Sequence, residues 1–158
     1  MNIKEEFRLA LRELVYPVCV VSAYNDQTNE NHAITVSSVT SLSFDPPSIL
    51  VCINKDSSIH SSLKKDSNFN ISFLSSSQTE ISNLCGTDEL SDKRFDNDFW
   101  DFKNNIGFIK NSQSVISCTI KEITNHGSHS VFFGDVVEVI KNGNTKPLLY
   151  GQGKYLDI

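Results

Sequence analysis

The sequence has no long hydrophobic run and no concentration of positive charge. A helix needs about 20 apolar residues to cross a bilayer, and no stretch approaches that length. The first twelve residues alternate charged and apolar side chains, without the apolar core of a secretory signal. The formal net charge is −5, and no stripe of lysine and arginine offers itself to a phosphate backbone. These absences predict a cytoplasmic protein that binds neither membranes nor nucleic acid.

The sequence also lacks a metal motif and a disulfide framework. Its four cysteines lie 33 residues apart, but their neighbours do not repeat, so the spacing does not indicate a repeat protein. No CxxC and no Cys/His pair has the spacing of metal ligands. We therefore predict no metal site and four reduced thiols that act mainly as small buried hydrophobic residues: Cys19, Cys52, Cys85 and Cys118.

Two nucleotide signatures are missing as well. There is neither a GxGxxG fingerprint nor a P-loop, so any nucleotide must be held in another way. Nothing resembles a Ser–His–Asp triad or a pair of catalytic carboxylates. The chain is thus not a nucleotide-binding protein of the doubly wound type.

Short apolar runs separated by turn residues are present instead. The 158 residues match the size of one domain, and 39% of them are hydrophobic. Helical spacing predicts helices at 3–15, 59–63 and 78–84, the last closed by Gly86, and residues 88–108 look like a long surface loop that could act as a lid. Strands outnumber helices without βαβ alternation, which predicts a mainly β protein, an antiparallel barrel. The expected strands are 18–23, 33–36, 48–54, 69–74, 114–124, 130–140, 147–150 and 154–156.

The densest polar cluster runs from Thr35 to Ser43, where six of nine residues carry hydroxyl groups. Hydroxyl and backbone N–H groups on a bend can bind the polar edge of a heterocycle or a phosphate. The same composition is also typical of a solvated edge strand. Composition alone leaves both interpretations open.

A second polar cluster, Asn54 to Ser58, lies where a strand ends and a helix begins. Backbone donors and the positive end of a helix dipole gather there, and Lys55 adds a charge. The simpler interpretation is an ordinary helix cap. His129 beside its strand could position a substrate, and Arg94 could bind a phosphate, but each could equally be a surface residue.

Taken in order, the motifs of the chain resemble the flavin reductase-like family of NAD(P)H:flavin oxidoreductases, the reductase components of two-component monooxygenases. The resemblance runs nearly from end to end. The motifs that carry it are Phe7-Arg8, Tyr16-Pro17-Val18, Thr35-Val36-Ser37-Ser38, Ser41-Leu42-Ser43, Asp45-Pro46-Pro47, Ser57-Ser58, Phe69 to Leu74 with Gln78, Arg94-Phe95, Gly127-x-His129, Gly134-x-Val136, Pro147 to Tyr150 and Gly153-x-Tyr155.

The resemblance implies a split antiparallel β-barrel with a few short flanking helices, a single flavin reductase-like domain over residues 1–158. It implies a homodimer that binds FMN or FAD near the subunit interface, with NADH or NADPH as hydride donor. It implies His129 as the catalytic residue, facing the nicotinamide. The residues implied to bind the flavin are Thr35, Val36, Ser37, Ser38, Ser41, Leu42, Ser43, Cys52, Asn54, Lys55, Ser57, Ser58, Phe73, Leu74, Ser75, Gln78, Arg94 and Tyr155.

The implied activity is NAD(P)H-dependent reduction of flavin by hydride transfer, which would supply reduced flavin to a partner monooxygenase. Because cofactors carry that chemistry, the lack of a strong acid or base in the sequence agrees with it. The alternative is a split-barrel flavoprotein that holds FMN tightly as an electron carrier or oxidase. A third interpretation is a β-barrel without flavin, in which the serines are ordinary caps and edge residues.

Overall fold

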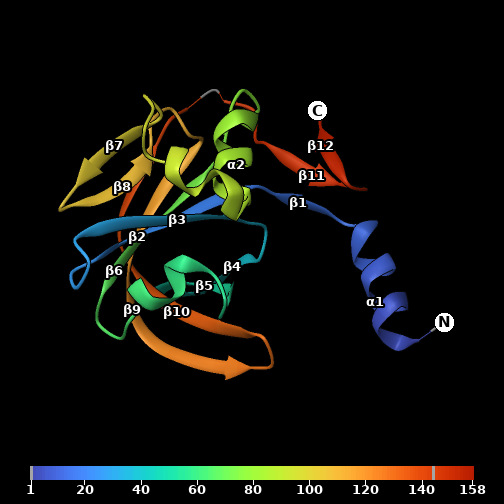
Figure 1. Cartoon of the computed structure of the whole chain (residues 1–158), viewed down its shortest axis with the longest axis horizontal. Coiled ribbons are helices and arrows are strands. Elements are labelled where there is room, and N and C mark those ends of the chain that lie inside the picture. Colours follow the sequence, from blue (N-terminus) through green and yellow to red (C-terminus); the bar gives the residue numbers. More distant parts are fainter. Residues whose placement is uncertain (1, 144) are drawn as a thin grey trace.

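The computed structural model describes residues 2–143 and 145–158. Its main feature is a seven-stranded antiparallel sheet with the strand order β3-β2-β6-β9-β10-β5-β4 (Figure 1). Strands β3 and β4 are the two edges of this sheet, and the chain passes from one edge to the other through Ser37 and Ser38. The predicted mainly β, split-barrel fold is confirmed. The strands are β2 (Cys19–Asn25), β3 (Glu30–Val36), β4 (Val39–Phe44), β5 (Pro47–Asn54), β6 (Asn68–Phe73), β9 (Ser114–His126) and β10 (His129–Lys141).

The sheet curls around a hydrophobic core, which is formed by the side chains on its inner face. On β5, Ile49, Val51 and Ile53 point inward while the residues between them face outward. Strand β2 is buried on both faces, which explains its continuous apolar run. At Gly134, a Cβ atom would lie 2.9 Å from the Phe69 ring, which is too close, so only glycine fits opposite this ring.

A second hydrophobic cluster lies outside the barrel and beneath helix α2 (Thr79–Gly86). Ile81 and Cys85 of this helix pack with Val20 of β2 and with Trp100. The predicted helix at 78–84 is thus confirmed in kind, and Gly86 is its last residue. The expected helix at 59–63 is a short 3-10 helix, η1 (Ser58–Ser62).

The expected long loop at 88–108 is wrong. It contains a 3-10 helix, η2 (Asp88–Lys93), and a hairpin of β7 (Trp100–Lys103) and β8 (Ile106–Ile109). The hairpin is fixed to the barrel, because the Ser22 hydroxyl and the Asn70 amide both donate to the Gly107 carbonyl, at 2.5 and 3.2 Å. A lid could open here only by breaking these buried bonds, so we assign the segment to the barrel wall.

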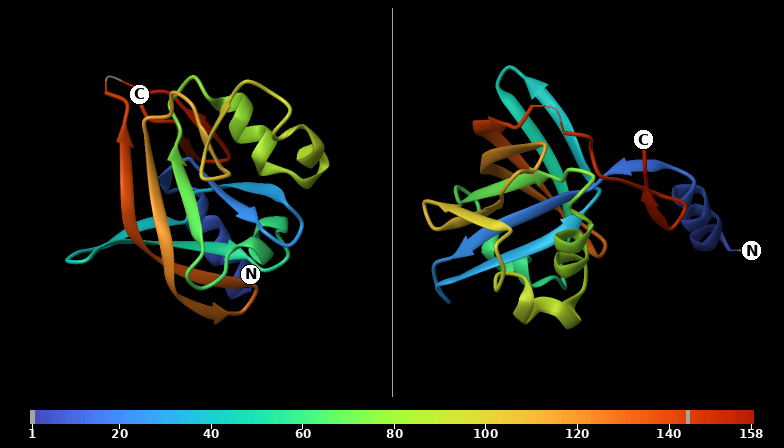
Figure 2. Two further views of the ribbon diagram at one scale, coloured as in Figure 1. Left: turned by 90° about the vertical axis from the view of Figure 1, so that its left-hand side faces the viewer. Right: turned by 90° about the horizontal axis from the view of Figure 1, so that it is seen from above.

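The two ends of the chain meet beside the barrel. Strand β1 (Val15–Pro17) pairs with β11 (Leu149–Gly151), which pairs with β12 (Lys154–Leu156). Helix α1 (Ile3–Arg12) is capped by the Asn2 side chain, which accepts from the Glu5 amide at 3.0 Å, and it ends three residues before the predicted boundary. It has no buried residue and stands away from the barrel (Figure 2).

Two expectations about composition can be compared with the described residues. All four cysteines are free, and Cys19, Cys85 and Cys118 are buried whereas Cys52 is half-buried. No described helix is long and apolar enough to cross a membrane.

Candidate functional site

The largest hollow among those described, about 560 Å³, opens where β3, α2 and the C-terminal hairpin meet. We call it the ring pocket. Four predicted flavin-binding residues line it, and eight further residues complete it. The lining residues are Val18, Thr35, Val36, Ser37, Ser82, Asn83, Gly86, Thr87, Tyr150, Gly153, Lys154 and Tyr155.

Hydrogen bonds across the ring pocket hold its three walls together. The Thr35 hydroxyl of β3 donates to the Ser82 carbonyl of α2 at 2.6 Å. From the other side, the Tyr155 hydroxyl lies 2.8 Å from both the Ser82 hydroxyl and the Asn83 side-chain oxygen. A phenol has one proton, so it donates to one of these oxygens at a time. This network fixes the position of the Tyr155 ring at the mouth of the pocket.

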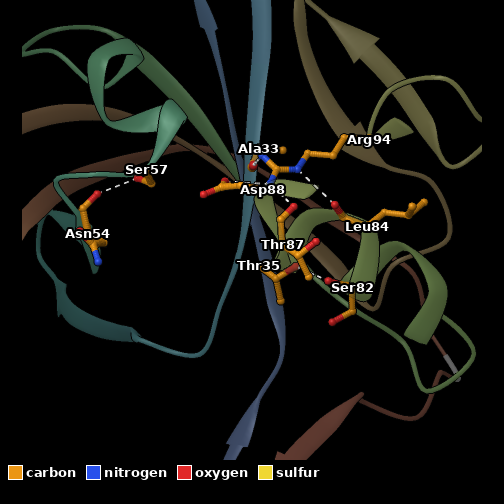
Figure 3. A network of polar contacts seen from close by, with 9 residues as sticks. All are labelled: Ala33, Thr35, Asn54, Ser57, Ser82, Leu84, Thr87, Asp88 and Arg94. Atoms are coloured by element: carbon orange, nitrogen blue, oxygen red, sulfur yellow. Dashed lines mark hydrogen bonds and ion pairs between the residues drawn. The ribbon is translucent and has the colours of Figure 1, made fainter. Parts of the chain in front are cut away.

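A smaller hollow of about 180 Å³ adjoins the ring pocket, because Gly86 lines both. We call it the phosphate pocket. Its lining residues are Ile34, Asn54, Asp56, Ser57, Cys85, Gly86, Asp88 and Arg94. In the view of Figure 3, Asp88 stands between the Asn54–Ser57 pair and Thr35.

The turn at Asn54 is fixed by its own hydrogen bonds. The Asn54 side-chain oxygen accepts from the Asp56 amide at 2.9 Å, and the Ser57 hydroxyl donates to the Asn54 carbonyl at 2.7 Å. Lys55 bonds through its ammonium group to the Gly127 carbonyl at 2.9 Å. Ser57 precedes η1 as expected, but its hydroxyl does not cap that helix. The turn is therefore preorganised, with the backbone amides of Lys55, Asp56 and Ser57 bonded within the protein.

Arg94 is 4% exposed, and its guanidinium group serves the fold. It donates to the carbonyls of Leu84, Ala33 and Thr87 at 3.1, 3.0 and 2.6 Å (Figure 3). Its charge is also 3.4 Å from Asp88, so little of it is free to attract a phosphate. Arg94 borders the phosphate pocket, and its hydrogen bonds join β3, α2 and the segment that follows η2. Its contact to a ligand stays a prediction.

His129 starts β10 and lies directly opposite Asn54 in the sheet register. It is exposed, and its Nδ1 lies 2.8 Å from the Ser128 hydroxyl. The backbone of the same hairpin accepts from the Lys55 amide at 2.9 Å. The structure thus brings His129 to the same end of the barrel as Asn54 and Lys55, while its catalytic role stays a prediction.

Other predicted flavin-binding residues lie away from both pockets. Ser41, Leu42 and Ser43 belong to edge strand β4, so the segment beyond Ser38 is a strand and not a bend, and their contact with a flavin stays a prediction. The Ser38 hydroxyl donates to the carbonyl of Cys52 at 2.7 Å, and both residues lie on the barrel's outer side beside β4.

The predicted group at the end of β6 is structural. Leu74 belongs to the cluster beneath α2, and Phe73 packs against the barrel core. The Gln78 side chain accepts from the Ser75 amide at 3.0 Å and donates to the Lys110 carbonyl at 2.7 Å. The structure gives these four residues a packing role, and their contact with a flavin remains a prediction.

The residues of α2 are the main omission of the sequence analysis. Ser82, Asn83, Gly86 and Thr87 line the ring pocket, yet they carry no motif. They reach β3 only through tertiary packing. A helix that ends in glycine next to a polar residue was the only available signal.

The ring pocket is suited to a planar heterocycle. The ring pocket combines the Tyr150 and Tyr155 rings with hydroxyl groups at its edge. A Cβ built on Gly86 meets only Thr35, at 3.9 and 4.0 Å, so there is room for a side chain at this shared border of the two pockets. Cys85 borders the phosphate pocket, but burial raises the pKa of its thiol to about 12 despite nearby Arg94, so it is neutral and not a nucleophile.

Fold and site together define a split-barrel protein with open hollows between β3, α2 and the C-terminal hairpin. The chain belongs to the family of the flavin reductase like domain, whose model matches residues 11–158. The family named from the motifs is therefore confirmed.

Named relatives and solved structures agree with this family. The reductase component of the FADH(2)-dependent resorcinol hydroxylase of Rhizobium sp. (strain MTP-10005) is 30% identical over 98% of this chain and 87% of its own. The NADH:riboflavin 5'-phosphate oxidoreductase of Streptomyces pristinaespiralis is 29% identical over 92% of this chain and 82% of its own. An NADH:FAD oxidoreductase of Streptomyces globisporus, solved with NAD and FAD fragments, shares the fold with a TM-score of 0.89 at 22% identity, covering 100% of this chain and 95% of its own.

Proposed function

We propose that this protein reduces a flavin with NADH and supplies the reduced flavin to a partner monooxygenase. The observation that carries the proposal is the ring pocket, walled by Thr35 and Tyr155 and joined past Gly86 to the Asn54–Ser57 turn. Family membership and relatives named as NADH-dependent reductases support it.

In this proposal the chain's residues bind and orient the cofactors. Tyr155, fixed by Ser82 and Asn83, packs against one edge of the flavin ring, and the Thr35–Ser37 segment provides polar contacts along the opposite edge. The turn at Asn54 would hold the phosphate through the Asn54 side-chain amide and the Ser57 hydroxyl, which line the phosphate pocket. When bound, NADH supplies a hydride to the flavin ring, so the chain needs no strong acid or base. Positioning and exclusion of water are its contributions.

We further propose that the chain works as a homodimer and as one domain in the cytoplasm. Helix α1 exposes Ile3, Phe7 and Leu11, and the tip of the β4–β5 hairpin exposes Phe44 at 90%. Apolar side chains on two separate arms support burial against a second copy. The four free thiols support a reducing compartment.

The test of the proposed function is an anaerobic visible spectrum of the protein with FMN, before and after NADH is added. Bleaching of the flavin bands well above a protein-free control is expected. A spectrum that changes on binding but does not bleach, with NADPH tried as well, would indicate an electron carrier or oxidase. No change in either state would exclude flavin chemistry.

A graded substitution at Gly86 ties that activity to the pocket. Gly86→Leu places a side chain in the passage between the ring and phosphate pockets, so flavin affinity should fall at least tenfold, whereas Gly86→Ala should have a smaller effect. Glu80→Leu, on the exposed side of the same helix, is the matched control and should leave affinity unchanged. Equal affinity in all three variants would place the flavin elsewhere.

A further inference from the structure

A third hollow of about 510 Å³ continues the groove beyond Arg94. Arg94 lines both this hollow and the phosphate pocket, just as Gly86 lines both the phosphate and ring pockets. We call it the distal pocket. Its lining residues are Glu30, Asn31, His32, Ala33, Ser58, Ser91, Asp92, Arg94, Phe95 and Phe102.

The three hollows follow one another along β3, an edge strand of the large sheet. Ile34 lines the phosphate pocket, between Thr35 on the ring side and Ala33 on the distal side. The volumes are about 560, 180 and 510 Å³, which is large, small and large in order. An FMN molecule would fill the first two and leave the third. A flavin dinucleotide has a flavin ring, then its phosphates, then an adenine ring, which matches the order of large, small and large hollows.

The side chains of the distal pocket match the chemistry of an adenosine group. The Phe102 ring on β7 is 51% exposed and offers an open face to a base. Phe95 is already packed on Trp100, with ring centroids 4.4 Å apart, so it forms a firm apolar floor. Glu30 and Asp92 are acceptors for an exocyclic amine or ribose hydroxyl groups.

The walls of the distal pocket are fixed before any ligand arrives. The Asn31 side chain donates to the Asn105 carbonyl at 2.9 Å and accepts from the Gly107 amide at 3.0 Å, which holds the β7–β8 hairpin against β3. Nδ1 of His32 lies 2.7 Å from the Ser62 hydroxyl. Binding would therefore order few side chains, which favours affinity.

We infer that the distal pocket binds the adenosine group of FAD, so that this protein prefers FAD to FMN. The inference rests on the proposed function, since it assumes that the flavin ring occupies the ring pocket. The adenosine group of NADH has the same chemistry, and the order of the three hollows favours FAD because the distal pocket borders the phosphate pocket at Arg94.

The test compares FAD and FMN affinity, measured by flavin fluorescence without NADH, in wild type and in Phe102→Ala. Stacking of a base on an aromatic ring is worth about 1–3 kcal/mol, so the substitution should weaken FAD binding about tenfold and leave FMN binding unchanged. Phe108→Ala is the matched control, because Phe108 lies on the same hairpin but lines a separate hollow beside Lys103. It should change neither affinity.

Two further measurements keep the inference falsifiable. Ser91→Trp, at an exposed position, should fill the distal pocket and reduce FAD affinity selectively. Free adenosine should compete with FAD and not with FMN. If Phe102→Ala instead raises the KM for NADH and leaves FAD affinity intact, the pocket belongs to the nicotinamide nucleotide and the inference is overturned.

The outcomes separate this inference from the proposed function. Equal affinity for FMN and FAD in wild type, with NADH-dependent bleaching of both, would overturn the distal pocket alone. Failure to bind either flavin would overturn both. Tight FAD binding without bleaching by NADH would support the distal pocket and overturn the reductase activity.

Discussion

Apolar side chains are buried in the barrel interior and exposed on the two projecting arms, which are helix α1 and the tip of the β4–β5 hairpin. Inside the barrel, Phe69 and Phe132 are fully buried. On the arms, Phe7 is 62% and Phe44 90% exposed. The same residue type thus stabilises the fold in one region and remains unpaired in the other.

The difference indicates which region folds by itself. The sheet gives every inward side chain a neighbour from the same chain, whereas helix α1 buries none of its residues. An exposed amphipathic helix gains little stability from propensity alone. We therefore expect the interior to set the stability of the fold and the arms to set its assembly.

Removal of a ring from the interior should have the largest effect. Phe69→Ala leaves a cavity opposite Gly134, where the neighbours cannot collapse, and should lower the free energy of unfolding by about 3–5 kcal/mol. Phe44→Ala, the same substitution on an arm, should change the stability of the dilute protein by less than about 0.5 kcal/mol. Urea unfolding of both variants measures the contrast, and similar losses would contradict it.

Alkaline pH should weaken the interior next. Burial raises the pKa of Cys19 and Cys118 from 9.0 to about 12, and burial also raises that of Cys85 to about 12. Between pH 9 and 12 the unfolded chain loses these protons and the folded chain keeps them, so stability falls as the pH rises. By pH 10 each thiol should cost about 1 kcal/mol.

Urea titrations at pH 8, 9 and 10 measure this loss. A Cys118→Ala variant is less stable overall but should lose less between pH 8 and 10 than wild type. An identical pH slope in both proteins would show that these thiols are not responsible.

The hydrogen bonds of the ring pocket should matter less to stability and more to binding. Tyr155→Phe removes the contacts to Ser82 and Asn83, which should cost about 1 kcal/mol of stability. Because the ring then loses its fixed position, the KM for flavin should rise several-fold with a smaller change in kcat. A fall in kcat alone would contradict this positioning role.

The smallest effect on the fold is expected on helix α1. Phe7→Glu should change the free energy of unfolding of the dilute protein by less than about 0.5 kcal/mol, yet shift the protein to monomer in sedimentation velocity. Lys4→Glu, also exposed on this helix, should leave the oligomeric state unchanged. If the protein with Phe7→Glu is still a dimer, the interface lies at the β4–β5 arm and not at helix α1.

Local patterns predicted the strands well. The apolar alternation at 69–74 became β6 at Asn68–Phe73 with a one-residue shift, because that alternation is a property of neighbouring side chains. The β7–β8 hairpin was missed although its turn is visible in the sequence. Asn104 and Asn105 both have positive φ, at 51° and 67°, which suits a tight hairpin turn. Charged Asp101 and Lys103 on the outer face hid the alternation.

The site was predictable only in part, and Arg94 shows why. As an arginine in a polar segment it predicts a surface contact to phosphate, yet in the fold it satisfies three backbone carbonyls. Thr35 and Tyr155 were predicted for the site, whereas Ser82 between them was not. Nothing in the local sequence of α2 records which strand the helix will cover.

The sequence by itself determined most strands of the large sheet, the hydroxyl-rich segment around Ser37 and Ser38 and the family, since these depend on the order and local pattern of residues. Only the tertiary structure decided that three hollows border one another at Gly86 and Arg94. Such a groove requires strands and a helix from distant parts of the chain to pack in one register. Burial of shared apolar surface, and no single motif, fixes that arrangement.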